Sequence, residues 1–337
     1  MGTVNHMDLD ALTAARRGEW ARLDELSRTR ALSGPEVDEL VARYRSASAD
    51  LADLKTSAGR TATGDHVSTL LGRARLRLTA GTENPLRRLP RFFARQLPAA
   101  LYRVRWTTLG VALGFVAVGA LVATWIAGDP AVLAALGSEA ELEQYAEEDF
   151  TGYYSENPAA VFAGQVWTNN AWIAAQCVMF GITGLWPVYV IVQNAVGVGA
   201  AAAVLFAFDH GDVFFASILP HGLLELTSVF VAAAAGLHVF WAWVAPGRRT
   251  RGAAFAAAGR SMATIVVGLV LSLALSGVIE GYITRQPWPA WVKIGIGAAA
   301  LGLFLAYMLI LGRRAARDGE TGDLTEDEAG TPQLVAG

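Results

Sequence analysis

The feature that most constrains this chain is a stretch of 142 residues, from Trp106 to Gly247, that contains no lysine or arginine. Eighteen of the 27 basic residues come before it. A soluble domain of that length normally carries charges of both signs, whereas a bundle of membrane helices does not need them. Hydrophobic residues make up 53% of the chain and charged residues only 17%. We therefore predict an all-α fold, a polytopic membrane helix bundle with an N-terminal cytoplasmic helical domain.

The bundle is predicted to contain about six spans, because apolar segments near 20 residues long follow one another after residue 106. They lie at 107–127, as a pair within 161–208, in a segment that ends at Ala245, near 261–280 and near 291–311. The transmembrane domain is accordingly 107–312. Within it, we expect the fourth helix to begin at Pro220, since proline suits a first helical turn.

The flanking regions are polar and differ from one another. Residues 1–83 show helical spacing of leucines and predict a helical hairpin or three-helix bundle. Residues 84–106 alternate six arginines with aromatic and aliphatic residues, which is typical of an amphipathic helix on an anionic membrane surface. The neighbouring span makes the lipid bilayer a simpler partner for this helix than nucleic acid. Residues 313–337 are polar and predicted to be a disordered cytoplasmic tail.

Basic residues also predict the orientation of the chain in the membrane. The N-terminal region, 246–252 and 312–317 are basic, so both termini are expected in the cytoplasm. The loop 128–160 has eight acidic residues and no basic one, so it is expected outside. Its helical spacing predicts an external helix over the bundle, and its acidic face is either a solvated surface or a docking surface.

Polar residues within the predicted spans are the candidate functional residues, because burying them in hydrocarbon is unfavourable. His221 and Glu225 are four residues apart and share one helix face. Glu280, Asn169 and Asn170 fall at a similar depth, and Asn194 lies deeper. Three interpretations remain open. The groups pair and hold the helices together, or His221, Glu225 and Glu280 bind a divalent metal, or the cluster lines a path for an ion or solute.

Several of these residues stand in motifs that resemble the stage II sporulation protein M family. The matching motifs are TNNAWIAAQCVMFGITG with Asn169 and Asn170, QNAVGVGA with Asn194, Pro220-His221-Gly222 with Glu225, and VIEGYI with Glu280. The resemblance covers roughly 107–312, and the N-terminal region is similar to a long, actinobacterial branch. One departure is Ala195, where the family often has glycine, which puts a close backbone contact there in question.

The resemblance implies a multi-pass protein of the bacterial inner membrane that works with partners. The founding member acts during engulfment beside proteins that degrade peptidoglycan and is thought to anchor them. We therefore predict a scaffold or anchor of a cell-envelope assembly, with membrane or wall-remodelling proteins as partners and a homo-oligomer as an open alternative. No catalytic residue or cofactor is assigned, apart from the candidate divalent metal. The alternatives are a metal-dependent intramembrane hydrolase and a solute or ion transporter that use the same cluster.

Overall fold

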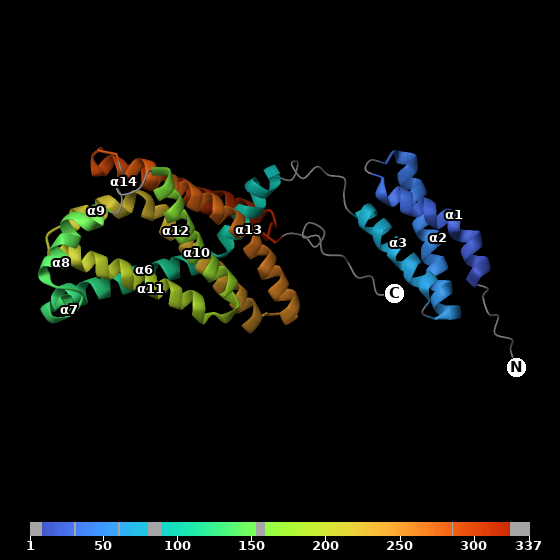
Figure 1. The fold of residues 1–337 in the computed structure, drawn as a ribbon, viewed down its shortest axis with the longest axis horizontal. Coiled ribbons are helices and arrows are strands. Elements are labelled where there is room, and N and C mark those ends of the chain that lie inside the picture. Colours follow the sequence, from blue (N-terminus) through green and yellow to red (C-terminus); the bar gives the residue numbers. More distant parts are fainter. Residues whose placement is uncertain are drawn as a thin grey trace. The chain divides into compact units, whose positions relative to one another are not determined.

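The computed structural model describes residues 9–29, 32–59, 61–79, 89–152, 159–284 and 286–323, and every regular element among them is helical (Figure 1). The chain divides into two compact units. Unit 1 comprises Met1–Pro85 and Thr325–Gly337, and unit 2 comprises Leu86–Leu324. The predicted all-α class is thus confirmed, and each unit has its own hydrophobic core.

Unit 1 is a three-helix bundle made of α1 (Leu9–Arg28), α2 (Gly34–Ala58) and α3 (Ala62–Thr79). Helix α2 begins at a capping box in which the Glu36 carboxylate accepts hydrogen bonds from the backbone N–H and the hydroxyl of Ser33. Apolar residues from all three helices form one buried core: Trp20, Leu23, Leu26, Leu40, Ala47, Leu54, Val67, Leu70, Leu71 and Ala74. The helical spacing in the sequence therefore corresponds to three mutually packed faces.

Unit 2 is a bundle of long helices. They are α6 (Arg105–Gly128), α10 (Ala159–Met179), α11 (Leu185–Ala207), α12 (Gly211–Val244), α13 (Arg251–Val278) and α14 (Ala290–Ala306). A π-helical turn, η4 (Ile279–Thr284), continues α13, while η5 (Tyr307–Leu311) and α15 (Gly312–Arg317) continue α14. Helix α12 is the central one, because it packs against α6, α10, α11, α13 and α14.

Five helices among the described residues are long and apolar enough to cross a membrane. They are α6, α11, α12, α13 with η4, and α14 with η5 and α15. The predicted second span forms α10, which is also long but carries Gln165, Asn169, Asn170 and Gln176. Because of those four polar side chains, α10 is long enough to cross a membrane but less apolar than the other five helices. A multi-pass membrane protein is therefore established, while a sixth crossing by α10 stays a prediction.

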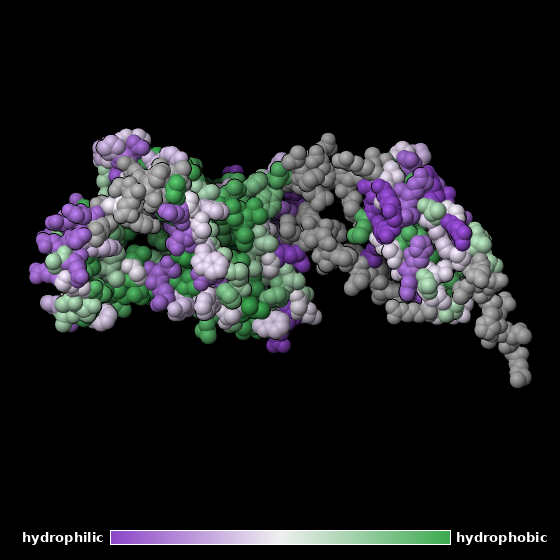
Figure 2. Space-filling model, in the orientation of Figure 1, coloured by the Kyte–Doolittle hydropathy of each residue, from purple (hydrophilic) through white to green (hydrophobic). Residues whose placement is uncertain are grey.

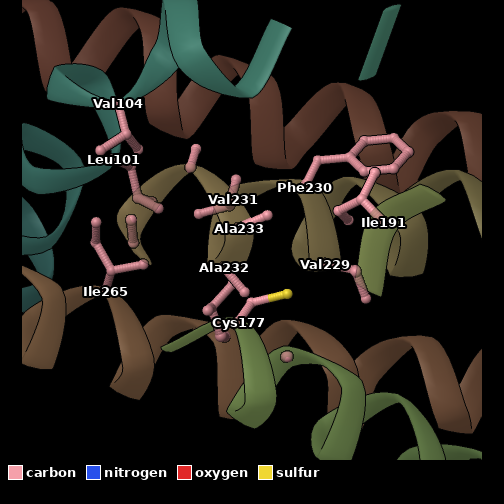
Figure 3. Close-up of a cluster of buried hydrophobic side chains, with 14 of the residues drawn as sticks. Leu101, Val104, Cys177, Ile191, Val229, Phe230, Val231, Ala232, Ala233 and Ile265 are labelled. Carbon is pink, nitrogen blue, oxygen red and sulfur yellow. The ribbon is translucent and has the colours of Figure 1, made fainter. Parts of the chain in front are cut away.

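The core of unit 2 is built largely from small residues of α12. Residues 231–235 are fully or almost fully buried, and they meet side chains from α10, α11 and α13 (Figure 3). Gly236 of α12 lies against the backbone of α10, so that an added Cβ would overlap the carbonyl oxygen of Cys177. Small side chains at such positions let membrane helices approach closely and gain packing contacts. Figure 2 shows hydrophobic residues over much of the outer surface of this unit, as lipid contact requires.

The basic segment before the first span is helical in its described part, from Leu89 to Arg103. It includes the π-helical turn η1 (Phe92–Gln96) and α5 (Leu97–Arg103). The apolar side of α5 is buried and packs on α13, η5 and α15, while Arg91, Arg95 and Arg103 are exposed. This helix is amphipathic, but its apolar face contacts the protein's own bundle. Contact between its arginines and the membrane surface stays a prediction.

The acidic segment after α6 forms short helices: α7 (Pro130–Ala134), α8 (Glu139–Gln144), the π-helical turn η2 (Tyr145–Asp149) and α9 (Phe150–Gly152). They gather at one end of unit 2 in Figure 1. Leu142 and Ala146 are buried against Val204 of α11, and Phe150 stacks on Phe214 of α12. The segment is therefore packed onto the ends of two long helices. The rest of the predicted loop, 153–158, lies outside the described residues.

The C-terminal region departs from the predicted disorder. The chain is helical to Arg317, and residues 318–323 then return along the bundle. Asp323 forms an ion pair with Arg260 of α13 at 2.7 Å, and Glu320 forms one with Arg91 at 3.2 Å. These carboxylates neutralise arginines near the cytoplasmic ends predicted for the helices, which the polar composition alone does not indicate. The prediction for 313–337 is thus wrong for 313–323, and 324–337 lie outside the described residues.

Candidate functional site

The candidate site lies between two polar stripes, one on α12 and one on α13 with η4. The first stripe contains His221, Glu225 and Ser228 at spacings of four and three residues. The second contains Ser272, Ser276, Glu280 and Thr284, each four residues from the next. Residues three or four apart lie on one side of a helix, so both helices present a row of polar side chains. Ser228 and Ser272 meet at 2.9 Å between their hydroxyl oxygens.

The helix that carries His221 begins earlier than predicted. Helix α12 starts at Gly211 and contains Pro220 in its interior. Its first turns are covered by the acidic segment, through contacts such as that of Phe150 with Phe214, so this part of the helix has protein to pack on before it reaches the bundle. At Pro220, α14 approaches so closely that a Cβ at Gly297 would overlap the Pro220 carbonyl oxygen. That close contact fixes the backbone one residue before His221.

Three titratable groups converge at the site. The His221 Nε2 atom lies 3.5 Å from Oε1 of Glu280. One ligand-type atom from each of His221, Glu225 and Glu280 can be chosen so that all three lie within 4.8 Å of one another. The two carboxyl groups come from different helices, so α12 and α13 cannot pack here without bringing them together.

Neighbouring hydroxyl groups orient these side chains. Thr284 places its Oγ1 atom 3.3 Å from Nδ1 of His221. Ser276 donates to Oε2 of Glu225 at 3.2 Å and lies 3.0 Å from the backbone carbonyl oxygen of His221. Lys293 donates from Nζ to the backbone carbonyl of Thr284 at 3.0 Å, which holds the last turn of η4. The rotamers of His221 and Glu225 are therefore fixed from the opposite helix.

The site is enclosed. The exposed fractions of His221, Glu225 and Glu280 are 6%, 8% and 3%. Oε2 of Glu280 has no hydrogen-bond partner among the described residues. An unsatisfied buried polar atom usually costs about 1–3 kcal/mol, and more for a charged group. The unpartnered Oε2 atom of Glu280 lies beside two other titratable groups, His221 and Glu225, and is therefore the least satisfied polar atom of the site.

The asparagines predicted for the cluster have different positions. Asn170 of α10 is within hydrogen-bond reach of Glu225 and also donates to the Val166 carbonyl at 3.2 Å. Asn169 is exposed, and Asn194 of α11 donates to the Val190 carbonyl of its own helix at 2.8 Å. The structure thus brings Asn170 to the site, whereas no described contact joins Asn169 or Asn194 to it.

Sequence reasoning missed three residues of the site: Ser272, Ser276 and Thr284. The sequence does contain a pattern that marks them, because together with Glu280 they form a polar repeat at every fourth residue from 272 to 284. Serine and threonine are common in membrane helices, so each one alone carries little information.

The family resemblance put a close backbone contact at Ala195 in question, because the family often has glycine at this position. Ala195 is buried, and the Cβ of an alanine at Gly119 would lie 3.4 Å from its carbonyl oxygen, so α6 and α11 do approach closely there.

The fold and this site together define a class of protein: a polytopic α-helical membrane protein with a buried His–Glu–Glu centre between two of its spans. Residues 109–285, more than half of the chain, match the family model described as Stage II sporulation protein M. The chain belongs to that family, and all three residues of the centre lie within the matched region.

The N-terminal helices match a different model. Residues 10–80, which include nearly all of α1 to α3, match one described as Domain of unknown function (DUF8413). No curated protein and no solved structure matches the chain. The two family matches fall on the two structural units, one on each.

Proposed function

We propose that this protein is an integral membrane anchor of a cell-envelope assembly that remodels peptidoglycan, as part of the sporulation-related family to which it belongs. The observation that carries the proposal is the acidic segment of unit 2. This segment is packed firmly onto the helix ends, yet its charges face outward, as an anchor surface for a partner requires.

The acidic segment has two different sides. Its apolar side, with Leu142 and Ala146, is buried in a small core with α11. Its other side exposes six carboxylates, contributed by Asp129, Glu139, Glu141, Glu143, Glu147 and Glu148. Figure 2 shows this hydrophilic end of unit 2. A rigid surface of one charge attracts and orients a partner of opposite charge, so we expect a basic surface on the partner.

Helix α10 is the sixth crossing in this proposal. Asn170 lies beside Glu225, and seven residues later Cys177 lies beside Gly236. Residue numbers thus rise together along both helices, which means that α10 runs in the same direction as α12 within the bundle. With α10 as a span, both termini lie in the cytoplasm and the acidic segment lies outside, in agreement with the distribution of basic residues.

The enclosure of the polar centre favours an anchor over the hydrolase. A catalytic metal keeps a coordination position open to water and substrate, whereas His221, Glu225 and Glu280 are each less than a tenth exposed. A transport path would also have to reach this centre from water. The centre is better suited to joining α12 with α13, so that the outer end of the bundle remains rigid.

The decisive experiment is photo-crosslinking in cells from the acidic segment. A photoreactive amino acid is placed at Glu143, which is exposed, and the adducts are identified by mass spectrometry. We expect adducts with peptidoglycan-modifying enzymes or their membrane partners. The matched control places the same probe at Leu303, an exposed position on α14 within a predicted span, where adducts with lipid are expected. If Glu143 gives only adducts that Leu303 also gives, the anchor proposal is wrong.

Topology is tested separately with the single native cysteine removed. Because Cys177 is the only cysteine, a Cys177→Ala chain provides a background for labelling. New cysteines at Glu143 and at Gly247 should react with a membrane-impermeant maleimide from opposite sides of the membrane. Labelling of both from the same side would exclude six spans with this orientation.

A further inference from the structure

We propose that His221, Glu225 and Glu280 together bind one divalent transition-metal ion, of the class to which zinc belongs, and that this ion joins α12 to η4. The inference is independent of the anchor function. It rests on the spacing of the three ligand atoms, on the orientation of the imidazole ring, on the unpartnered oxygen of Glu280 and on the charge balance of the centre.

The spacing of the ligand atoms suits one ion. Nitrogen and oxygen ligands bind zinc at about 2.0–2.2 Å, so two of them around a tetrahedral ion lie about 3.3–3.5 Å apart. Nε2 of His221 and Oε1 of Glu280 are 3.5 Å apart, and all three ligand atoms lie within 4.8 Å of one another. Only Glu225 has to approach further, and its side chain belongs to the same helix as His221.

The imidazole ring is oriented for coordination. Nδ1 of His221 lies 3.3 Å from Oγ1 of Thr284, which can accept a hydrogen bond from the Nδ1–H group. Metal-bound histidines usually donate from the ring nitrogen that does not bind the metal, and this fixes the tautomer. In that tautomer Nε2 carries a lone pair directed toward Oε1 of Glu280. Two acceptor atoms then face each other, and a cation between them removes their repulsion.

A shared proton explains the centre less well than an ion. A hydrogen bond between a carboxyl group and an imidazole is normally about 2.7–3.0 Å long, and a separation of 3.5 Å is weak at best. A protonated Glu280 would also leave Oε2 without a partner, as it is among the described residues. An ion bound by Glu280 can accept electron density from either carboxylate oxygen, so it accounts for both observations.

Charge balance leads to the same conclusion. Two carboxylates and a neutral imidazole carry two negative charges, which are very unfavourable in a membrane interior unless compensated. Neither Glu225 nor Glu280 forms an ion pair with lysine or arginine among the described residues. Lys293 of α14 donates to the backbone carbonyl of Thr284 and not to either carboxylate. A divalent cation neutralises the centre completely.

The ligand types and the burial define the class and the role of the ion. One imidazole nitrogen with two carboxylate oxygens suits zinc, manganese or iron better than magnesium or calcium, which prefer oxygen ligands alone. Ser276 and Asn170 support Glu225 as outer ligand contacts do in known metal sites. The enclosed position indicates a structural ion that stabilises the pairing of α12 with α13 and η4.

The test uses the full chain, purified in detergent through an affinity tag that does not bind metals. Metal content is measured by mass spectrometry after purification, and again after separate incubation with Zn²⁺, Mn²⁺ and Fe²⁺ followed by desalting. We expect close to one ion per chain in the wild type for at least one metal. The variant Glu280→Gln, which preserves shape but not charge, should hold less than a tenth as much.

Stability distinguishes the metal from simple hydrogen bonding. A chelator should lower the melting temperature of the wild type to that of Glu280→Gln and should leave the variant unchanged. The matched control is Ser272→Ala, which removes a buried hydroxyl from the same stripe but no ligand, and it should retain the ion. If Glu280→Gln cannot be purified, the metal content and the chelator response of the wild type still decide the question.

Two results would overturn the proposal. One is a wild-type chain that binds none of the three metals above a tenth of an ion and melts at the same temperature with and without chelator. The other is a Glu280→Gln variant that keeps the wild-type metal content, which would place the ion elsewhere.

Discussion

Unit 1 and unit 2 each bury a carboxylate among helices, and they satisfy it in different ways. In unit 1, Asp50 accepts from Trp20 Nε1 at 3.0 Å with one oxygen and pairs with Arg16 Nε at 3.3 Å with the other. In unit 2, Glu280 meets His221 at 3.5 Å through one oxygen, and its other oxygen has no described partner. Both carboxylates are almost fully buried, so the difference lies in their partners.

The difference follows from where each unit can obtain positive charge. Arg16 keeps part of its side chain in water while its guanidinium reaches inward, which long side chains at a soluble surface can do. At the centre in unit 2 no basic side chain does this: among the described residues neither Glu225 nor Glu280 pairs with lysine or arginine, and Lys293 of α14 donates to a backbone carbonyl. A buried carboxylate there needs a charge that does not come from the chain, and this is why a bound ion is a reasonable partner.

The two units are also held together by different contacts, and the largest effect we predict tests this in unit 2. In Gly236→Val the new side chain would overlap the Cys177 carbonyl, and α10 could not approach α12. Because backbone rather than a flexible side chain stands in the way, we expect loss of the folded membrane unit. The measurement is the monodisperse fraction and melting temperature of the purified protein in detergent.

The control for this variant is Gly295→Val on α14. A Cβ at Gly295 has no atom within 4 Å, so its valine should be tolerated. If the two variants behave alike, close approach of α10 and α12 is not what assembles unit 2, and the comparison between the units fails.

In unit 1 the corresponding contact is a large side chain. Leu23→Ala removes a fully buried leucine from the three-helix core and should lower the free energy of unfolding by about 2–5 kcal/mol. Chemical denaturation of a fragment spanning 1–85, followed by circular dichroism, measures this loss. Leu76→Ala, at a residue that is 57% exposed, should change it by less than about 0.5 kcal/mol. Equal losses would argue against the packed core.

The buried carboxylate of unit 1 gives a smaller effect. In Asp50→Ala the indole N–H of Trp20 loses its acceptor, which should cost about 1–3 kcal/mol. In a Trp20→Phe background there is no indole N–H to leave unpaired and only the pair with Arg16 is lost, so the same substitution should cost less. A double-mutant cycle by chemical denaturation of the same fragment measures the difference. If the two costs are equal, the hydrogen bond from Trp20 does not satisfy Asp50.

The sequence was sufficient for the features that depend on composition and spacing. The absence of basic residues predicted the membrane unit, leucine spacing predicted the helices around Leu23, and motif resemblance predicted the family. It was also sufficient to select His221, Glu225 and Glu280, because charged groups are rare within spans. Their convergence is a tertiary property, and the spacing within one helix gives no information about which helix lies opposite.

The failures have the same cause. Proline suits a first helical turn, so the sequence predicts a helix start at Pro220, but tertiary contacts with Gly297 support a helix through it. Polar composition predicts a disordered tail, although Asp323 has an arginine partner 63 residues away. Local propensity is overridden wherever a distant partner supplies the stabilisation, as happens for both residues.

The smallest predicted effect concerns partly exposed charges on the surface of unit 1. Hydrogen bonds from Arg22 and then Arg43 lower the pKa of Glu39 to about 2. In the unfolded chain a glutamate has a pKa of about 4.3, so the native state favours the ionised form. The stabilisation is complete above pH 4.3 and is lost as the pH falls toward 2. Because the Glu39 side chain is 32% exposed, water and salt screen the effect.

Comparison of the wild-type fragment with Glu39→Gln isolates this contribution, since the other carboxylates titrate in both. The wild type should be slightly more stable at pH 7, and its advantage should shrink between pH 4.3 and pH 2 and also at high salt. Denaturant midpoints at several pH values provide the measurement. A difference that stays constant across this range would mean that Arg22 and Arg43 do not hold Glu39, and that these surface ion pairs contribute nothing measurable to the stability of unit 1.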